Sequence, residues 1–246
     1  MRLPKSTTGT GTEVDPETID VQHWFDGFAM HHRFEIFPGG MRVKYSSRKG
    51  ADDLENRIIG NGSHDTYSFG QISDPCQSIF RKFFTAFKYI REKRQGNEFR
   101  TPSGVSVNVT LSPDMPGAMP STLRKSDSAT QGPHYIVAKS DNDKLQVIDA
   151  ESLQPLKSFP YKSIDPRLDG QLFAAHSCKD GETEEIYNFS CKLGGRFPVY
   201  KIFRISADDR VDVLAEIKDA PASYIHSFAM TKRYIILCVW QAYITQ

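Results

Sequence analysis

Short runs of alternating hydrophobic and polar residues fill the second half of the chain. From His134 to Trp240 these runs are HYIVAKS, KLQVIDA, LFAAHS, EIYNFSC, PVYKIFRIS, DVLAEIK, YIHSFAM and YIILCVW. Turn-forming clusters separate them at intervals of roughly 8 to 15 residues, which is typical of all-β domains. The pattern predicts an all-β array, and the spacing alone leaves a sandwich, a barrel and a propeller open.

Alternation also predicts a β-hairpin near the start of the ordered chain. Residues 29–37 alternate, Pro38, Gly39 and Gly40 break the pattern, and residues 41–47 alternate again. Such a break between two β runs is typical of a hairpin turn. Residues 51–64 are charged and then rich in Gly and Asn, so we expect a loop there.

The remaining segments differ in character. Residues 104–111 (GVSVNVTL) predict a strand, and residues 112–132 predict a long mobile loop of Ser, Pro, Met and Thr. Residues 1–20 are polar and rich in Thr and Gly, so we expect them to be disordered. Residues 21–246 are then expected to form one domain.

One amphipathic helix is predicted over residues 75–94. Asp74 suits the N-cap and Pro75 the first helical position. An aromatic stripe faces one way and lysines and arginines surround it. One interpretation is a helix packed on the domain; the other is an interfacial helix that presses its stripe into a bilayer, with Cys76 open to acylation. The docking residues would be Ile79, Phe80, Phe83, Phe84 and Phe87.

Composition narrows the classes of partner. The net charge is +1 and charged residues make up 25% of the chain, so no global field favours a nucleic acid. No apolar run reaches the length of a membrane span, and the N-terminus lacks the apolar core of a signal peptide. We therefore expect a cytoplasmic protein, whose four cysteines are reduced and mostly buried because none has CxxC spacing.

Two isolated histidines mark the candidate chemistry. His176 and His226 each lie at the end of a predicted strand, followed by turn residues. Two such residues suit a metal held by separate strands that converge on one axis, although a purely structural role is the simplest alternative. A zinc site from His176, Cys178 and Cys191 is conceivable, but the spacing fits no established zinc pattern.

A series of motifs resembles the carotenoid cleavage oxygenases. HWFDGFAMHHRFEI followed by Ser47-Arg48 is similar to that family's entry motif, and DPCQSIFRKFFTAF is similar to its amphipathic segment. VNV, IDAESLQPL, AAHSCKDGETEEIYNFSCKLG and YIHSFAMTKRYIIL then follow in the family's order. The resemblance extends from His23 to about Trp240 and is nearest to fungal members that cleave torulene or β-carotene.

The resemblance implies a seven-bladed β-propeller with one Fe(II) on its axis, held by four histidines that three glutamates orient. His176 matches the first iron ligand and His226 the second. Asp141 falls where one of the glutamates is expected, with Asp143 as the alternative register. A carboxylate there would accept a hydrogen bond from a ligand imidazole and fix its tautomer. The implied reaction is cleavage of a conjugated C=C bond in a carotenoid or apocarotenoid by O2, with a lipophilic polyene as substrate.

The chain also departs from the family pattern. The other two iron histidines belong to regions beyond Gln246, and the Leu-Pro…Asn-Gly-Pro opening is missing. We therefore expect a partial propeller of three to four blades, with exposed sheet edges, marginal stability and impaired activity. It would lie in the cytoplasm and attach peripherally to membranes. Two alternatives remain: a dioxygenase that cleaves stilbene-type substrates, and a non-catalytic propeller-like binding fragment without metal.

Overall fold

Antiparallel β-strands make up most of the computed structural model, which describes residues 2–4, 18–20, 27–61, 101–120, 132–194 and 197–240. One α-helix and one short 3₁₀ helix accompany the strands within these ranges. The elements are β1 (Arg2–Pro4), β2 (Thr18–Asp20), β3 (Met30–Ile36), β4 (Val43–Lys49), α1 (Asp52–Asn61), β5 (Thr110–Pro113), β6 (Tyr135–Lys139), β7 (Lys144–Asp149), β8 (Pro155–Pro160), η3 (Tyr161–Ser163), β9 (Leu172–Phe173), β10 (Cys178–Lys179), β11 (Ile186–Lys192), β12 (Val199–Ile205), β13 (Val211–Ile217), β14 (Ala229–Met230) and β15 (Ile235–Ile236).

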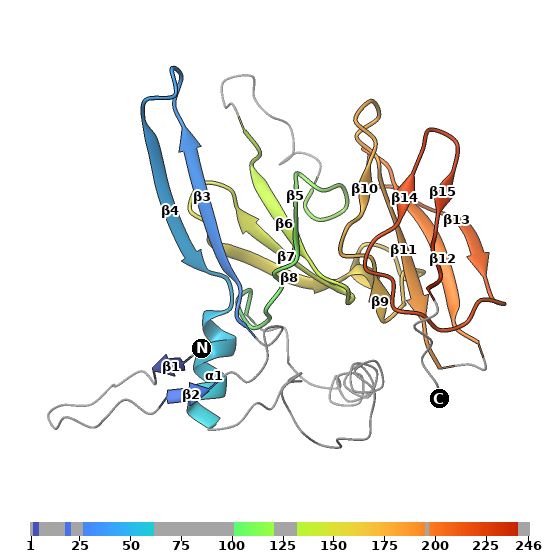
Figure 1. The fold of residues 1–246 in the computed structure, drawn as a ribbon, viewed down its shortest axis with the longest axis horizontal. Helices are drawn as coiled ribbons and strands as arrows, with labels where there is room; N and C mark the ends of the chain where they lie inside the picture. The colour runs from blue at the N-terminus through green and yellow to red at the C-terminus, as the bar shows by residue number, and fades with distance from the viewer. Residues whose placement is uncertain are drawn as a thin grey trace, which may run out of the picture.

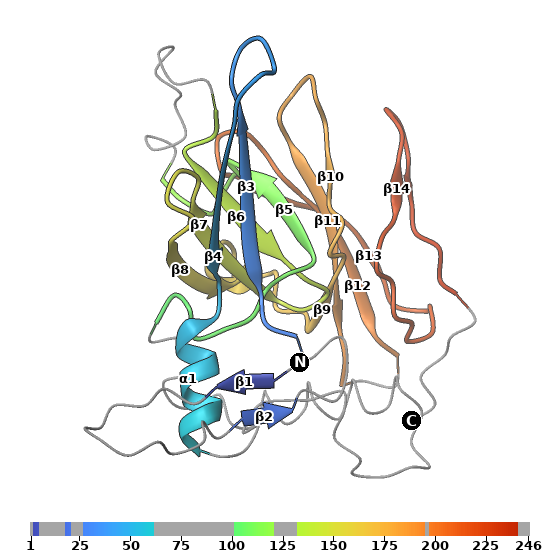
Figure 2. The same ribbon diagram turned by 60° about the vertical axis from the view of Figure 1, so that its left-hand side comes forward.

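Four sheets follow one another in chain order (Figures 1 and 2). The hairpin β3–β4 comes first, then the sheet β5–β6–β7–β8, then a five-stranded sheet of β9 to β13, and finally the hairpin β14–β15. A further pair, β1–β2, forms from the N-terminal residues. The predicted all-β class is confirmed.

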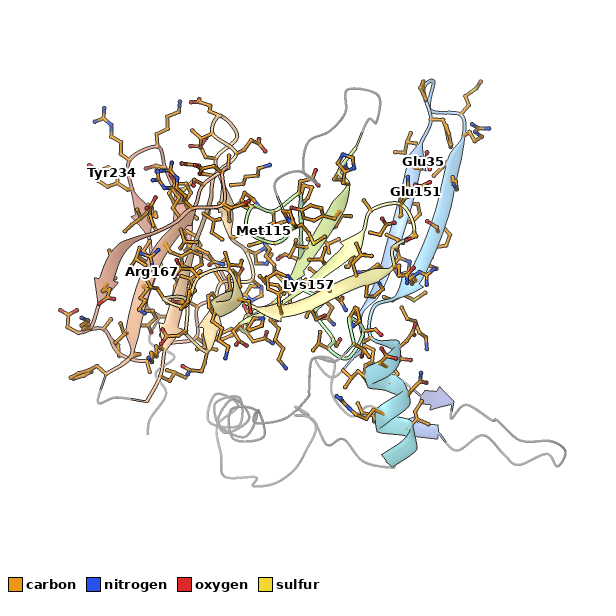
Figure 3. The ribbon with its side chains drawn as sticks, turned by 180° about the vertical axis from the view of Figure 1, so that it is seen from behind. Glu35, Met115, Glu151, Lys157, Arg167 and Tyr234 are labelled. Carbon is orange, nitrogen blue, oxygen red and sulfur yellow. The ribbon has the colours of Figure 1, made fainter. Side chains whose placement is uncertain are left out.

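The main core lies between the sheet β5–β8 and the sheet β9–β13. Its centre is a group of three aromatic rings. Tyr161 stacks on Phe173 with ring centroids 4.1 Å apart, and Phe203 meets both rings edge-on at 6.0 and 6.2 Å. Met115, which the sequence placed in a mobile loop, is fully buried between the two sheets (Figure 3). This core fixes the two sheets on which the candidate site is built.

A second core covers the opposite face of β5–β8 and corrects one expectation. Val105 and Val107 are buried against Ala138 and Ile148, but they lie in irregular chain. The strand expected at residues 104–111 begins only at Thr110. The expectation was wrong because alternating burial against a sheet face produces the same residue pattern as a strand within the sheet.

Residues 51–64 contain a helix, so the loop expected there was wrong. Asp52, Asp53 and Glu55 occupy the first turn of α1, where carboxylates interact favourably with the helix dipole. Leu54 and Ile58 lie one turn apart and are buried together with Ala51. This short apolar stripe was hidden among charged residues.

Most of the other expected elements are confirmed, with differences at their ends. The hairpin at residues 29–47 forms as β3–β4, and the turn uses Gly39 and Gly40 at positive φ of 88° and 69°. The strand β8 was missed because Pro155 and Pro160 bound it, which an edge strand tolerates. The runs LFAAHS, YIHSFAM and YIILCVW contribute only two strand residues each.

The structure does not test two of the predictions. The helix at residues 75–94, with its docking residues Ile79, Phe80, Phe83, Phe84 and Phe87, lies outside the described residues. The division into a disordered segment 1–20 and a domain 21–246 also stays a prediction. No helix among the described residues is both long and apolar enough to cross a membrane.

A lysine is buried in the sheet β5–β8. Lys139, the last residue of β6, is 2% exposed, and its ammonium donates a hydrogen bond to the Ser177 hydroxyl. Burial lowers the pKa of Lys139 to about 8. Since one pKa unit corresponds to about 1.4 kcal/mol, keeping this amine charged costs the folded state about 3 kcal/mol.

Truncation of the aromatic core should destabilise the fold. We expect Phe203→Ala to lower the free energy of unfolding by about 3–5 kcal/mol, because it removes a fully buried ring and leaves a cavity. Phe34→Ala is the matched control, because Phe34 is 64% exposed, and should change this free energy by less than about 0.5 kcal/mol. Urea denaturation followed by circular dichroism measures both. Equal effects would contradict the assigned core.

The buried Lys139 should make the free energy of unfolding rise with pH. Below pH 8 the amine is charged in both states, so the penalty is complete; between pH 8 and 10.5 only the unfolded state holds the proton, so stability rises with pH. Lys139→Met should therefore be more stable than the wild type at pH 7, by up to about 3 kcal/mol. The difference should close by about pH 10.5.

The control for this comparison is Lys232→Met, since the Lys232 side chain is 83% exposed. Its stability difference from the wild type should not vary over the same pH range. A gap between Lys139→Met and the wild type that stays constant from pH 7 to 10.5 would contradict the buried, easily deprotonated amine.

Candidate metal centre

His176 lies on an irregular segment between β9 and β10. Ala174 and Ala175, just before it, are fully buried, whereas the His176 side chain is exposed. The segment leaves the β ladder after Phe173, so its backbone groups need other partners. Side chains from neighbouring strands provide them.

Two polar side chains bind the backbone before His176. The Asn188 amide donates to the carbonyl of Ala174 at 3.0 Å and accepts from its N–H at 3.2 Å. The Thr110 hydroxyl donates to the carbonyl of Ala175. Because Asn188 is on β11 and Thr110 is on β5, both main sheets determine where His176 lies.

His226 lies on a second irregular segment, between β13 and β14. The Tyr200 hydroxyl fixes its start: it donates to the carbonyl of Pro221 at 2.8 Å and accepts from the N–H of Ser223 at 2.9 Å. The two histidine segments then run side by side, in a parallel bridge between His176 and Ser227. Residues fifty positions apart are thereby brought together.

The two imidazoles meet through their Nε2 atoms. The Nε2 atom of His176 is 3.0 Å from the Nε2 atom of His226. The ring centroids are 4.7 Å apart, and the rings are inclined at 69°. The expectation that these two residues converge therefore agrees with the structure, although their role as ligands is a separate matter.

Asp141 lies behind His226. Its carboxylate oxygens are 2.8 and 2.9 Å from Nδ1 of His226, and its side chain is only 13% exposed. The sequence left Asp141 and Asp143 as alternatives, and it is Asp141 whose carboxylate reaches this imidazole. Oδ1 of Asp141 also accepts from the N–H of Ala175 at 3.4 Å. One carboxylate therefore contacts both histidine segments.

These contacts define the tautomer of His226. An ionised carboxylate only accepts hydrogen bonds, so Nδ1 of His226 must carry the proton that points at Asp141. A neutral imidazole protonated on Nδ1 has its lone pair on Nε2, the atom that faces His176. The pair is therefore prepared either to share a proton or to bind a cation.

The sequence did not single out Tyr224. Its hydroxyl is 2.5 Å from Oδ2 of Asp141 and 3.2 Å from Nδ1 of His226. Burial, followed by the hydrogen bond to Asp141, raises the pKa of Tyr224, so the hydroxyl remains a donor. A local clue existed, since residues two apart in a β run point to the same side.

The zinc alternative is wrong. Cys191 is fully buried within β11, packed with Phe189 and Tyr200, whereas the His176 side chain is exposed. The Cys178 thiol points to the carbonyl of Phe228 at 3.8 Å. Across the described ranges between residues 27 and 240, no three His, Cys, Asp or Glu side chains gather in a way that could hold a metal.

The histidine pair does fit two positions of a six-coordinate ion. Metal–imidazole bonds of about 2.1 Å that meet at 90° put the two nitrogens about 3.0 Å apart, whereas a tetrahedral angle requires about 3.4 Å. The observed Nε2–Nε2 distance is 3.0 Å. The donor set agrees as well, because imidazole suits iron and Asp141 supports it from behind. The remaining positions would need ligands from outside this pair.

Comparison with known proteins gives the relatives of this chain. It is 32% identical to a carotenoid dioxygenase of Neurospora crassa over 96% of its length and 40% of the relative's. It is 33% identical to a torulene dioxygenase of Gibberella fujikuroi over 88% of its length and 37% of the relative's. The chain thus spans about two fifths of the length of these curated relatives.

Solved structures and a family model add to this. A lignostilbene dioxygenase of Pseudomonas brassicacearum superposes with a TM-score of 0.53 at 21% sequence identity, over 86% of this chain and 35% of that one, which shows a shared fold. The family model described as retinal pigment epithelial membrane protein (RPE65) matches residues 6–246. The chain therefore belongs to this family, which is the carotenoid oxygenase family that its motifs resemble.

Proposed function

We propose that this chain is part of an Fe(II)-dependent dioxygenase that cleaves a conjugated C=C bond of a carotenoid or apocarotenoid to two carbonyl products. His176 and His226 supply two of the metal ligands through Nε2. The observation that carries this proposal is the 3.0 Å separation of these two atoms, with Asp141 at Nδ1 of His226. The names of the relatives, carotenoid dioxygenase and torulene dioxygenase, support the substrate class.

Each residue has a defined task in this scheme. Bound iron would supply the activation of O2 next to the double bond. Asp141 keeps the proton on Nδ1 of His226, so that Nε2 offers its lone pair, and it makes this imidazole a stronger donor. Asn188 and Thr110 keep the His176 segment in place while its ring remains exposed at the site.

We also propose that these sheets are three to four blades of an incomplete propeller. Strands β6 and β7 are buried on both faces, whereas the hairpins at the two ends of the array expose apolar side chains. On β3–β4 these side chains lie on one face of the hairpin, and on β14–β15 they include Ile236 and Tyr234. The exposed residues of the β3–β4 hairpin are all more than half exposed: Met30, Phe34, Ile36, Val43 and Tyr45. Further sheets would cover both ends, as blades of a seven-bladed ring do.

Two imidazoles alone hold iron weakly, so we propose that activity of the 246-residue chain by itself is impaired. O2 and a lipophilic polyene are the proposed partners. Location in the cytoplasm, with peripheral attachment to a membrane through residues 75–94, remains a proposal from the sequence. A stilbene-type substrate is the second candidate, favoured by the shared fold with a lignostilbene dioxygenase.

Metal binding tests the ligand assignment directly. We expect Co(II), a spectroscopic substitute for Fe(II), to bind the purified chain. His176→Ala or His226→Ala should weaken this binding by more than about 100-fold, which exceeds the loss typical of removing a group that only hydrogen-bonds to a ligand. His32→Ala is the matched control, since His32 is an exposed histidine hydrogen-bonded to Tyr45 on the hairpin. Titration calorimetry gives the affinities. Equal losses in all three variants would refute the assignment.

A chimera tests the activity. We expect this chain, placed in the Neurospora relative in exchange for the segment it matches, to form apocarotenals from torulene or β-carotene with iron and O2. His226→Ala in the same chimera should lower turnover by about 100-fold or more. Chromatography of the products measures both.

The other outcomes are equally informative. Cleavage of a hydroxylated stilbene without cleavage of a carotenoid would favour the second candidate. A folded chimera that holds no iron and forms neither kind of product would leave the non-catalytic binding fragment without metal as the correct description.

A further inference from the structure

The Tyr224 hydroxyl completes a chain of hydrogen bonds that ends at the candidate metal site. It donates to Oδ2 of Asp141 at 2.5 Å, and Nδ1 of His226 donates to the same carboxylate at 2.8 to 2.9 Å. Tyr224 and His226 are two residues apart, and the contacts of both with Asp141 place their side chains on the same side of this segment. Two side chains, those of Tyr224 and His226, therefore converge on one half-buried carboxylate.

The direction of each hydrogen bond follows from the chemistry. The hydroxyl has one proton, and it goes to the carboxylate at 2.5 Å rather than to Nδ1 of His226 at 3.2 Å. Nδ1 of His226 must then carry its own proton, because otherwise its lone pair would face the oxygens of both Asp141 and Tyr224. The arrangement selects one tautomer of His226, with the lone pair on Nε2.

Asp141 needs this support because it contacts two segments at once. Both of its oxygens lie within 2.9 Å of Nδ1 of His226, and Oδ1 also accepts from the N–H of Ala175, next to His176. The contact with Ala175 is long at 3.4 Å and holds the carboxylate loosely. The bond from Tyr224 to Oδ2 is the shortest of these contacts, and it holds the carboxylate from the side away from the N–H of Ala175, on Oδ2.

We propose that Tyr224 is a positioning residue of the metal site: its hydroxyl holds the Asp141 carboxylate so that Nδ1 of His226 stays protonated and Nε2 stays free for a cation. This inference rests on the proposed function for the identity of the cation. It assigns a role to the first residue of the motif YIHSFAMTKRYIIL, two positions before His226. Tyr224→Phe removes only the hydroxyl and keeps the ring.

The first test needs no metal. In the metal-free chain labelled with ¹⁵N-histidine, we expect the nitrogen chemical shifts of wild-type His226 to show the tautomer protonated on Nδ1. In Tyr224→Phe we expect a mixture of both tautomers. A wild-type His226 protonated on Nε2, or a Tyr224→Phe variant with unchanged shifts, would overturn the proposal. A wild-type His226 protonated on Nε2 would overturn the proposal even if the variant failed to fold.

The second test asks whether Tyr224 acts through Asp141. We expect Tyr224→Phe to weaken Co(II) binding by about 10-fold, within the range typical of groups behind a ligand. In an Asp141→Ala background the same substitution should change the affinity less than about twofold, because the coupled partner is gone. An equal loss in both backgrounds would show that Tyr224 acts by another route.

The control is Tyr45→Phe, which removes a hydroxyl that also binds Nδ1 of a histidine, His32, at 2.8 Å on the outer hairpin. It should leave Co(II) affinity and the shifts of His226 unchanged. If Co(II) fails to bind the wild type at all, the proposed metal function fails, whereas the tautomer measurement still decides the role of Tyr224.

Discussion

One half-buried carboxylate, that of Asp141, connects the parts of this molecule on which its chemistry depends. A charged group that is 13% exposed is tolerated only when hydrogen bonds compensate for the lost water. Here the partners are the N–H of Ala175, the hydroxyl of Tyr224 and Nδ1 of His226. They come from two segments far apart in the sequence, so the carboxylate is satisfied only when both segments are in place. The positions of the two imidazoles follow from this requirement.

The site also depends on strands that end early. A regular ladder through Ala174 and Ala175 would direct alternate side chains to opposite faces and use the backbone groups within the sheet. Instead, Asn188 and Thr110 take over these backbone groups, which frees the segment to turn and expose His176. Beneath it, the stacked rings of Tyr161 and Phe173 hold the last regular strand residue in the main core. Core packing thus fixes the position of Phe173, and the polar side chains of Asn188 and Thr110 fix the direction in which the His176 ring points.

The strands that the sequence predicted correctly are those marked by short local runs of apolar residues. The runs that became β6, β11, β12 and β13 were found because short apolar-rich runs bounded by turn residues are typical of strands, including those buried on both faces. The same rule wrongly predicted a strand at Val105 and Val107, because these residues pack on a sheet without joining it. Helix α1 was missed because its buried stripe is one turn long. These errors arise where tertiary packing, rather than periodicity, determines the conformation.

The candidate site was accessible from the sequence only in part. His176 and His226 were singled out as isolated histidines at predicted strand ends, whereas their assignment as ligands and the choice of Asp141 came from the family resemblance. Nothing in their spacing of thirty-five and fifty residues fixes a contact. Thr110 and Asn188 could not have been found, because their partners are backbone atoms of distant residues. Tyr224 alone left a local trace, through its two-residue offset from His226.

The most direct test is anomalous diffraction at the iron edge, from crystals of the protein grown anaerobically with Fe(II). The account predicts one strong peak about 2.1 Å from Nε2 of both His176 and His226, with Nδ1 of His226 still bonded to Asp141. A peak elsewhere, or imidazoles that remain paired with each other while no metal lies between them, would contradict it.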